Sequence, residues 1–232
     1  METDLQIILK KEMHMGKIDI YITRHGETLY NIMNCIQGWV DTPLTDLGID
    51  LATRLGDGLK NIEFENIFTS DMHRAVHTAE LILSKNLYMK KTKIMQDQRI
   101  REWCFGSMEG KSNSQLLCEI RKTIGDVNFE QINHYLPQVA EYIVKHDTTG
   151  WAETFSVIQK RLNSFLDDII NNYSGGNFLV VTHAFLIRTI IYLYGYDKLD
   201  KVSKIENVSI TKLEYINGKF NITEINNTDY IK

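Results

Sequence analysis

Short apolar runs that alternate with stretches of helical periodicity are the feature that most limits how this chain can fold. Strand-like runs are expected at about residues 17–23, 65–69, 92–96, 177–182, 207–215 and 219–225. Helices are expected at about residues 45–59, 71–87, 153–171 and 185–194, with further helices between 112 and 147. Such alternation is typical of α/β proteins, in which helices cover both faces of a mostly parallel sheet. We therefore predict a three-layer α/β sandwich.

The end of the chain predicts a different strand arrangement. Its last two apolar runs flank Asn217-Gly218, a pair that suits the tight type I′ turn of a hairpin. The sheet is therefore expected to have an antiparallel edge. The only prolines are Pro43 and Pro137, and no low-complexity stretch or long charge run marks a linker. Residues 17–232 are expected to form one domain.

Two segments stand outside this pattern. Residues 1–16 precede the first strand and are interpreted as an N-terminal extension. Residues 111–150 are polar and irregular, and an excursion of that size within an α/β domain commonly forms a lid. We expect this lid or insertion to cover the site and, together with residues 34–41, to select the ligand. The oligomeric state has no signature in the sequence.

The overall composition excludes several classes of protein. A hydrophobic share of 43% suffices for a substantial core, and the formal charge of −4 is spread over interleaved acidic and basic residues. No basic face indicates nucleic acid, and no apolar stretch is long enough for a membrane span. Cys35, Cys104 and Cys118 are widely spaced, which favours neither a disulfide framework nor a zinc ribbon. We expect a cytoplasmic protein without nucleic-acid or membrane partners.

Charged and reactive side chains follow four of the predicted strands. In chain order these residues are Arg24 with His25, Arg74, Glu102 and His183. In open α/β sheets, ligands bind at the carboxyl ends of the strands. Arg74 is expected in the first turn of a helix, where amides add partial positive charge to that of the guanidinium. The strand ends therefore predict one anion site that contains a reactive histidine.

Each of these pieces alone has an ordinary structural explanation. His25 before Gly26 is in isolation more often a half-buried histidine in a turn, and Arg74 a solvated helix residue. His73 and His77 have the i, i+4 spacing of zinc ligands, but no third ligand is evident nearby. Solvated histidines are expected there, and no metal site. The order of the pieces, each at a strand end, favours one shared site.

In this order the motifs resemble those of the histidine phosphatase superfamily, which has the phosphoglycerate mutase-like fold, from Ile18 to at least Arg188. The matching segments are Arg24-His25-Gly26-Glu27-Thr28 with Asn31, Gln37-Gly38 with Asp41-Thr42-Pro43-Leu44-Thr45 and Gly48, Ser70-Asp71 with Arg74-Ala75 and Thr78-Ala79, Glu102 with Phe105-Gly106 and Glu109-Gly110, and Val181-Thr182-His183. Two positions depart from the pattern. Ala184 replaces the glycine that usually follows the second histidine, and Ala152-Glu153-Thr154 lacks the glycine of the family's Gly-Glu-Ser type of sequence.

The resemblance implies a reaction that passes through a phosphohistidine. Neutral His25 would attack phosphorus through one ring nitrogen while the other donates to a nearby carbonyl. Glu102 would act as general acid and then as general base, with its pKa raised by Trp103 and Phe105. The groups that would hold the phosphoryl oxygens are Arg24, Asn31, Arg74, protonated His183 and the amide of Ala184. Residues that would lie near the substrate are Thr28, Gln37 and Gly38. The chemistry requires no metal or cofactor.

Three functions are compatible with such a site. The first is a metal-independent phosphatase of small phosphomonoesters. The cations that residues 111–150 offer in the matching stretch are Lys111, Arg121 and Lys122, where phosphoglycerate mutases of the family carry paired arginines. With fewer cations to retain a bisphosphate, water is expected to win the competition for the phosphohistidine. The alternatives are a 2,3-bisphosphoglycerate-dependent phosphoglycerate mutase and a scaffold that binds phosphorylated ligands, although pure binding needs no proton donor such as Glu102.

Overall fold

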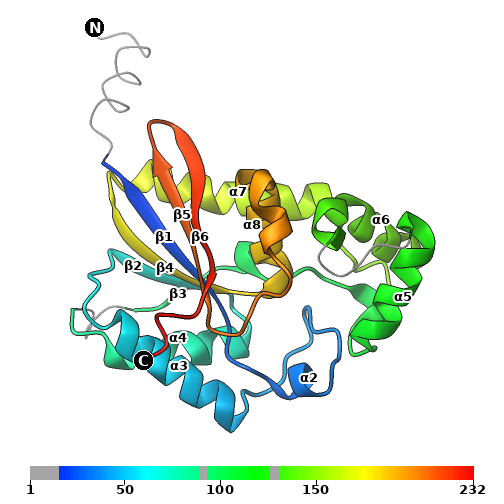
Figure 1. The fold of residues 1–232 in the computed structure, drawn as a ribbon, viewed down its shortest axis with the longest axis horizontal. Helices are drawn as coiled ribbons and strands as arrows, with labels where there is room; N and C mark the ends of the chain where they lie inside the picture. Colours follow the sequence, from blue (N-terminus) through cyan, green and yellow to red (C-terminus); the bar gives the residue numbers. More distant parts are fainter. Residues whose placement is uncertain (1–15, 89–92, 126–130) are drawn as a thin grey trace, which may run out of the picture.

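A mixed six-stranded sheet runs through the centre of the computed structural model (Figure 1), which describes residues 16–88, 93–125 and 131–232. The strands are β1 (Ile18–Arg24), β2 (Asn66–Thr69), β3 (Met95–Gln96), β4 (Gly176–Thr182), β5 (Ile210–Ile216) and β6 (Lys219–Asn227). Their order across the sheet is β3-β2-β4-β1-β5-β6. The first four in that order are parallel, whereas β5 is antiparallel to β1 and β6 is antiparallel to β5. The predicted parallel sheet with an antiparallel edge is confirmed.

Helices cover both faces of this sheet (Figure 1). The α-helices are α2 (Leu29–Ile32), α3 (Asp46–Leu59), α4 (His73–Lys85), α5 (Asn113–Ile124), α6 (Leu136–His146), α7 (Phe155–Asn172) and α8 (Ala184–Tyr194), and the 3-10 helices are η1 (Gln98–Ile100), η2 (Gly106–Met108), η3 (Gln131–Tyr135) and η4 (Tyr196–Lys201). Ile20 and Ile22 of β1 belong to the core beneath α7 and α8, whereas Tyr21 belongs to the core beneath α3 and α4. Successive strand side chains point to opposite faces, so a continuous apolar run supplies both cores. The three-layer prediction is confirmed.

The two edges of the sheet differ in how well they match the sequence prediction. Asn217 and Gly218 have φ values of 52° and 77°, as a type I′ hairpin turn requires. At the other edge a strand was expected over residues 92–96, but β3 has only two residues, and residue 92 lies outside the described ranges. The Asp97 side chain accepts a 2.8 Å bond from the Arg99 amide and caps η1. The chain therefore turns away from the sheet directly after β3.

Two helix starts show where side chains cap the backbone. Thr45 caps α3, because its hydroxyl accepts a 3.0 Å bond from the Gly48 amide. The second start was predicted at Asp71, yet α4 begins at His73. The Asp71 carboxylate instead accepts two bonds from Arg101, at 2.6 and 2.5 Å. The Asp71 carboxylate is therefore engaged in an ion pair with Arg101 and does not cap α4.

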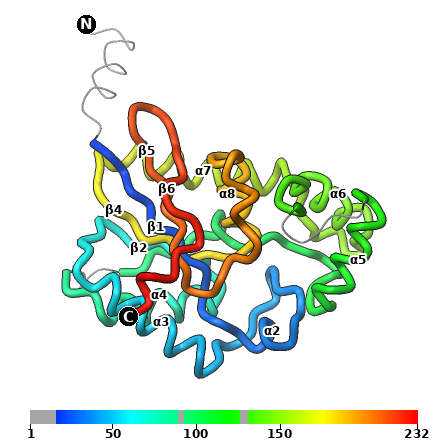
Figure 2. Tube along the Cα trace, in the orientation of Figure 1, coloured from blue at the N-terminus to red at the C-terminus, as the bar shows by residue number. Residues whose placement is uncertain are grey.

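The segment predicted as a lid lies at one end of the molecule. It forms α5, η3 and α6, and α6 packs against α7 beside the sheet (Figures 1 and 2). The chain after β6 returns to α3, where the Lys232 amide donates to the Arg54 carbonyl (Figure 2). Of the proposed extension 1–16, residues 1–15 lie outside the described ranges. Within those ranges, none of the helices combines the length and the apolar character that crossing a bilayer demands.

Candidate active site

The ends of β1 and β4 bring two histidines together at the carboxyl edge of the sheet. The strands pair in parallel up to Arg24 and Thr182, and the His25 amide extends the ladder with a 2.9 Å bond to the Thr182 carbonyl. His183 is the next residue along the chain, and the ring centroids of His25 and His183 are 5.3 Å apart. The register of two central strands therefore fixes the spacing of this pair.

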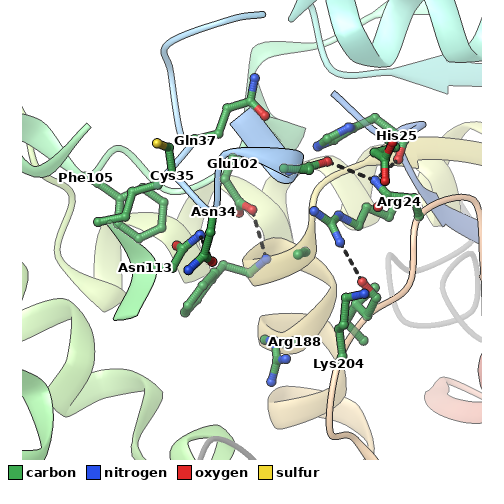
Figure 3. Close-up of a pocket in the computed structure, with 17 residues that line it drawn as sticks. Arg24, His25, Asn34, Cys35, Gln37, Glu102, Phe105, Asn113, Arg188 and Lys204 are labelled. Carbon is green, nitrogen blue, oxygen red and sulfur yellow. Dashed lines mark hydrogen bonds between the residues drawn. The ribbon is translucent and has the colours of Figure 1, made fainter. Parts of the chain in front are cut away.

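A cavity of about 350 Å³ opens beside His25 (Figure 3). Predicted site residues that line this cavity are Arg24, His25, Asn31, Gln37, Glu102 and Ala184. The predicted site residues Thr28, Gly38, Arg74 and His183 are not among the residues that line it. The structure thus brings the predicted residues to one place, where some line the cavity and others contact those that do.

His25 has the form of a nucleophile. Only 3% of it is exposed, and its Nδ1 lies 2.7 Å from the carbonyl oxygen of Gly26. Because a carbonyl can only accept, Nδ1 carries the proton, and the lone pair is on Nε2. Burial, together with the charges of Arg74 and Arg24, holds the pKa of His25 well below its usual range. The ring is therefore neutral, as attack on phosphorus requires.

Gly26 permits the turn that follows this histidine. A Cβ atom added at Gly26 would lie 2.7 Å from the carbonyl oxygen of Gly48 in α3. The glycine therefore allows the loop after β1 to lie directly against the start of α3. This close approach places the Gly26 carbonyl where it can orient the ring of His25.

His183 has the opposite tautomer. Its Nδ1 lies 3.0 Å from Nη2 of Arg74, and a guanidinium can only donate, so the ring proton is on Nε2. That Nε2 is buried without a hydrogen-bond partner among the described residues. Burial and the charge of Arg74 hold the pKa of His183 well below its usual range. The expectation of a protonated His183 is therefore corrected: with Nδ1 as an acceptor, the residue is a neutral N–H donor.

Arg74 supports the site from behind. It is fully buried, and its guanidinium donates to the carbonyls of Gly38 and Val40, at 2.6 and 3.0 Å, and to the Asp41 carboxylate at 3.1 Å. With the bond to His183, both Nη atoms are engaged, and the buried Nε has no partner among the described residues. Arg74 therefore positions the 38–41 turn and His183, and only Nε remains to contact an anion.

Arg24 is the cation that lines the cavity next to the nucleophile (Figure 3). Its Nη1 donates a 2.8 Å bond to the Ile205 carbonyl, while its buried Nε lacks a partner within the described ranges. Burial lowers the pKa of Arg24 to about 10, so the side chain is still charged at neutral pH. An anion bound at His25 would meet this charge.

Glu102 lies over the N-terminus of α8 (Figure 3). Its carboxylate accepts bonds from the amides of Trp103 and Leu186 at 3.0 Å and of Phe185 at 2.9 Å. These bonds lower the pKa of Glu102, but its burial is the larger effect and raises it. This is the direction that a proton donor requires. Ala184, the first residue of α8, also lines the cavity.

The remaining predicted residues form a network around α2. Asn31 lines the cavity, and its Oδ1 accepts a 3.2 Å bond from the Thr28 amide. The Thr28 hydroxyl, fully buried, donates to Oε1 of Gln37 at 2.7 Å. A Cβ atom at Gly38 would lie 2.2 Å from the carbonyl oxygen of Trp103. Thr28 and Gly38 therefore shape the turn, whereas Asn31 and Gln37 face the cavity.

Glu153 keeps a supporting role although the glycine before it is missing. Its carboxylate accepts from the Cys104 amide at 3.0 Å and pairs with Arg161 of α7 at 2.9 and 3.0 Å. Arg161 also donates to the main-chain carbonyls of Arg101 and Glu102, at 2.6 and 2.9 Å. The pair therefore holds the backbone that presents Glu102 to the cavity.

Several residues of the cavity wall were missed by the sequence prediction. They are Arg188 on α8 and Lys204, Ile205 and Asn207 in the turn before β5. Arg188 is one turn after Ala184, so helical periodicity could have indicated it. The turn could have been found from topology, because a strand antiparallel to β1 begins where β1 ends.

Two other expectations can be compared with the geometry. Among the described residues of 111–150, only Asn113 lines the cavity, and the expectation of a lid stays a prediction. His73 and His77 have ring centroids 5.8 Å apart, and within the described ranges no group of three or more His, Cys, Asp or Glu side chains could hold a metal ion.

Comparison with known families identifies the chain. The sequence profile of the histidine phosphatase superfamily (branch 1) matches residues 20–228. The chain belongs to this family. The resemblance inferred from the motifs is confirmed, and it extends beyond Arg188 to include β5 and β6.

Named relatives in this family have several activities. Fructose-2,6-bisphosphatase TIGAR B of Danio rerio is 44% identical over 142 residues, which are 61% of this chain and 53% of that relative. This chain thus spans about half the length of TIGAR B. Phosphoglycerate mutase-like protein 4 of Arabidopsis thaliana is 28% identical over 201 residues, 86% of this chain and 80% of that protein. The fold is similar to that in the crystal structure of phosphoglycerate mutase from Bacillus anthracis, with a TM-score of 0.86 and a sequence identity of 33%. The match covers 95% of this chain and 97% of that one. The phosphoglycerate mutase-like fold is confirmed.

Proposed function

We propose that this protein is a metal-independent phosphatase that hydrolyses small phosphomonoesters through a phosphohistidine on His25. The observation that carries the proposal is the state of His25: it is neutral, with its Nδ1 proton bound to the Gly26 carbonyl and its Nε2 lone pair available. Arg24 and Glu102 line the same cavity. A nucleophile, a cation and a proton donor thus adjoin one space.

The reaction has two steps. Nε2 of His25 bonds to phosphorus as the ester P–O bond breaks, and the departing alkoxide takes the proton of Glu102. The Glu102 carboxylate then takes a proton from water, whose oxygen bonds to phosphorus as the N–P bond breaks. Arg24, the Asn31 amide and Nε2–H of His183 stabilise the equatorial oxygens in both steps. Phosphate leaves, and His25 is again neutral.

The cavity wall favours a phosphatase over a mutase. A mutase must retain its phosphorylated intermediate, and the predicted cations of residues 111–150, Lys111, Arg121 and Lys122, do not line the cavity. The segment therefore contributes no cation to the cavity wall that would hold such an intermediate, which favours its hydrolysis. Glu102 in its turn argues against a scaffold, because a site that only binds phosphate gains nothing from a buried acid.

Two cations outside the 111–150 segment support a narrower substrate class. Arg188 and Lys204 also line the cavity, and Figure 3 shows both of them apart from His25. They suit a second anionic group of a substrate whose first phosphate lies at His25. The name of the TIGAR B relative specifies a sugar bisphosphate, which has this character. We therefore include bisphosphates among the substrates, and we place the protein in the cytoplasm because its three cysteines are free.

Phosphate release from a panel of phosphomonoesters, with a chelator present, tests this function. We expect release from the wild type and none from His25→Ala. The panel includes fructose 2,6-bisphosphate, a nucleotide, phosphoserine and 3-phosphoglycerate. Interconversion of 3- and 2-phosphoglycerate without release of phosphate would instead identify a mutase. Phosphate binding without any turnover would identify a scaffold.

A further inference from the structure

The side-chain amide of Asn207 lies between two parts of the site that come from distant segments. Its Nδ2 is 2.8 Å from the main-chain oxygen of His25 and 3.1 Å from Oδ1 of Asn31. Asn207 also lines the cavity, in the turn before β5. One amide group thus connects the nucleophile's backbone with α2.

Backbone groups fix which way both amides point. The Thr28 N–H can only donate, so the atom of Asn31 that it meets is the oxygen. The His25 carbonyl can only accept, so the atom of Asn207 that it meets is the nitrogen. The contact between the two side chains is then a consistent N–H···O bond. With its oxygen bound twice, Asn31 has only Nδ2 left for the cavity that it lines.

The turn that holds Asn207 has an unusual backbone. Val208 has a φ of 54°, a left-handed conformation that β-branched residues rarely adopt, and its side chain is fully buried. Its amide donates a 3.0 Å bond to the Arg24 carbonyl. The Glu206 amide donates to Oδ1 of Asn226 at 2.7 Å. Strained backbone of this kind persists only where surrounding bonds determine it, and the bond from Val208 to the Arg24 carbonyl is the one that keeps Asn207 against the site.

We propose that Asn207 is a positioning residue for phosphoryl transfer. It keeps Nδ2 of Asn31 directed into the cavity, toward the oxygens of a phosphoryl group at His25, and it holds the His25 main chain. This inference rests on the proposed phosphatase function. A donor that is oriented before the substrate arrives needs no reorganisation in the transition state. Without Asn207, only the Thr28 amide would orient Asn31.

The test uses Asn207→Ala, alone and combined with Asn31→Ala. We expect Asn207→Ala to lower kcat/KM for p-nitrophenyl phosphate by about 10- to 100-fold and to weaken the binding of inorganic phosphate by about tenfold. If Asn207 acts through Asn31, the same change in the Asn31→Ala protein should cost much less, because the two residues are coupled. Equal losses in both backgrounds would overturn the proposal.

A matched control removes a different bond from the same turn. Asn226→Gly deletes the side chain that binds the Glu206 amide, and glycine readily adopts the φ of 52° at that position. We expect it to lower the melting temperature without changing kcat/KM. If Asn226→Gly lost as much activity as Asn207→Ala, the effect of Asn207 would be general loosening of the turn, and the proposal would be wrong.

A second variant keeps the inference testable if Asn207→Ala does not fold. Asn31→Asp retains an oxygen for the Thr28 and Asn207 donors but places its other oxygen where Nδ2 faces the cavity. We expect it to bind phosphate more weakly than Asn31→Ala does, because like charges repel. Equal affinities would contradict the orientation. Phosphate affinity is measurable whether or not the wild type turns over, so failure of this inference is distinguishable from failure of the proposed function.

Discussion

Glu102 is held by three amide N–H groups that favour its carboxylate form, yet burial raises its pKa. The acid form is therefore retained to higher pH than in an exposed glutamate, as a proton donor requires. We expect hydrolysis of an alkyl phosphate to fall as the pH rises through this raised pKa. Glu102→Gln should lower kcat by about two to four orders of magnitude and flatten this limb of the pH profile.

A good leaving group separates the two roles of Glu102. p-Nitrophenolate departs without a proton, so Glu102→Gln should still form the phosphohistidine rapidly and show a burst of nitrophenolate. Its second step would be slow, because no base activates water. A burst slowed as much as the hydrolysis of the alkyl phosphate would count against Glu102 as the acid. Phosphate affinity should hardly change in this variant.

The same residues show what sequence can predict at this scale. Motif and strand-end position sufficed to place His25, Glu102 and His183 together. They did not reveal that Arg74 reaches away from the cavity to the 38–41 turn, or that it sets the tautomer of His183. Which atoms a long side chain contacts depends on packing between segments far apart in the chain. A residue pattern carries no such distances.

At the scale of elements, hydrophobic periodicity located the strands and most helices, because burial of one face imposes that period. It did not show which loops would reach the cavity. Residues 111–150 were expected above it, but within the described part of that segment only Asn113 is in the wall. The turn at residues 204–207 was missed, although β5 pairs with β1 and must begin near His25. Loop direction follows from strand pairing, which a list of elements leaves undetermined.

Helix α7 contacts residues 97–102, the strand exit that follows β3, and this contact between two elements can be tested. Arg161 binds the carboxylate of Glu153 and the carbonyls of Arg99, Arg101 and Glu102 with one planar guanidinium. Lysine cannot reproduce this set of bonds. Arg161→Lys should lower kcat for an alkyl phosphate by about tenfold with little change in KM, since it loosens Glu102 but not the phosphate site. Steady-state kinetics provide the check.

Arg99 offers a matched control for that contact. Its guanidinium also ties this strand exit to α7, through a 2.6 Å ion pair with Asp168 and a 3.1 Å bond to the Ser164 carbonyl, and its bonds among the described residues do not include Glu102. Arg99→Lys should therefore affect the melting temperature and leave kcat unchanged. If both variants lowered kcat equally, general stiffness of the contact would explain the result better than positioning of Glu102.

For the whole molecule, the two buried histidines couple stability to pH. The pKa values of His25 and His183 are held well below the usual 6.5 in the folded state, while in the unfolded chain they return to it. Acidification below about pH 6.5 therefore protonates the unfolded chain first and stabilises it. The contribution of each histidine is complete above that pH and is lost as the pH falls toward the folded-state pKa.

The expected loss is about 1.4 kcal/mol per pH unit for each histidine within that window. Glu102 acts in the opposite direction, because its raised pKa lets the folded state bind a proton that the unfolded chain releases, so the net slope is smaller than two histidines would give.

Urea unfolding between pH 5 and 8, in a buffer without oxyanions that could occupy the site, measures this slope. His25→Asn should reduce it, since asparagine can still donate to the Gly26 carbonyl but does not titrate. His73→Asn, at an exposed position on α4, serves as the surface control. Equal slopes for the wild type and His25→Asn would mean that His25 is not the buried neutral imidazole on which its role as nucleophile depends.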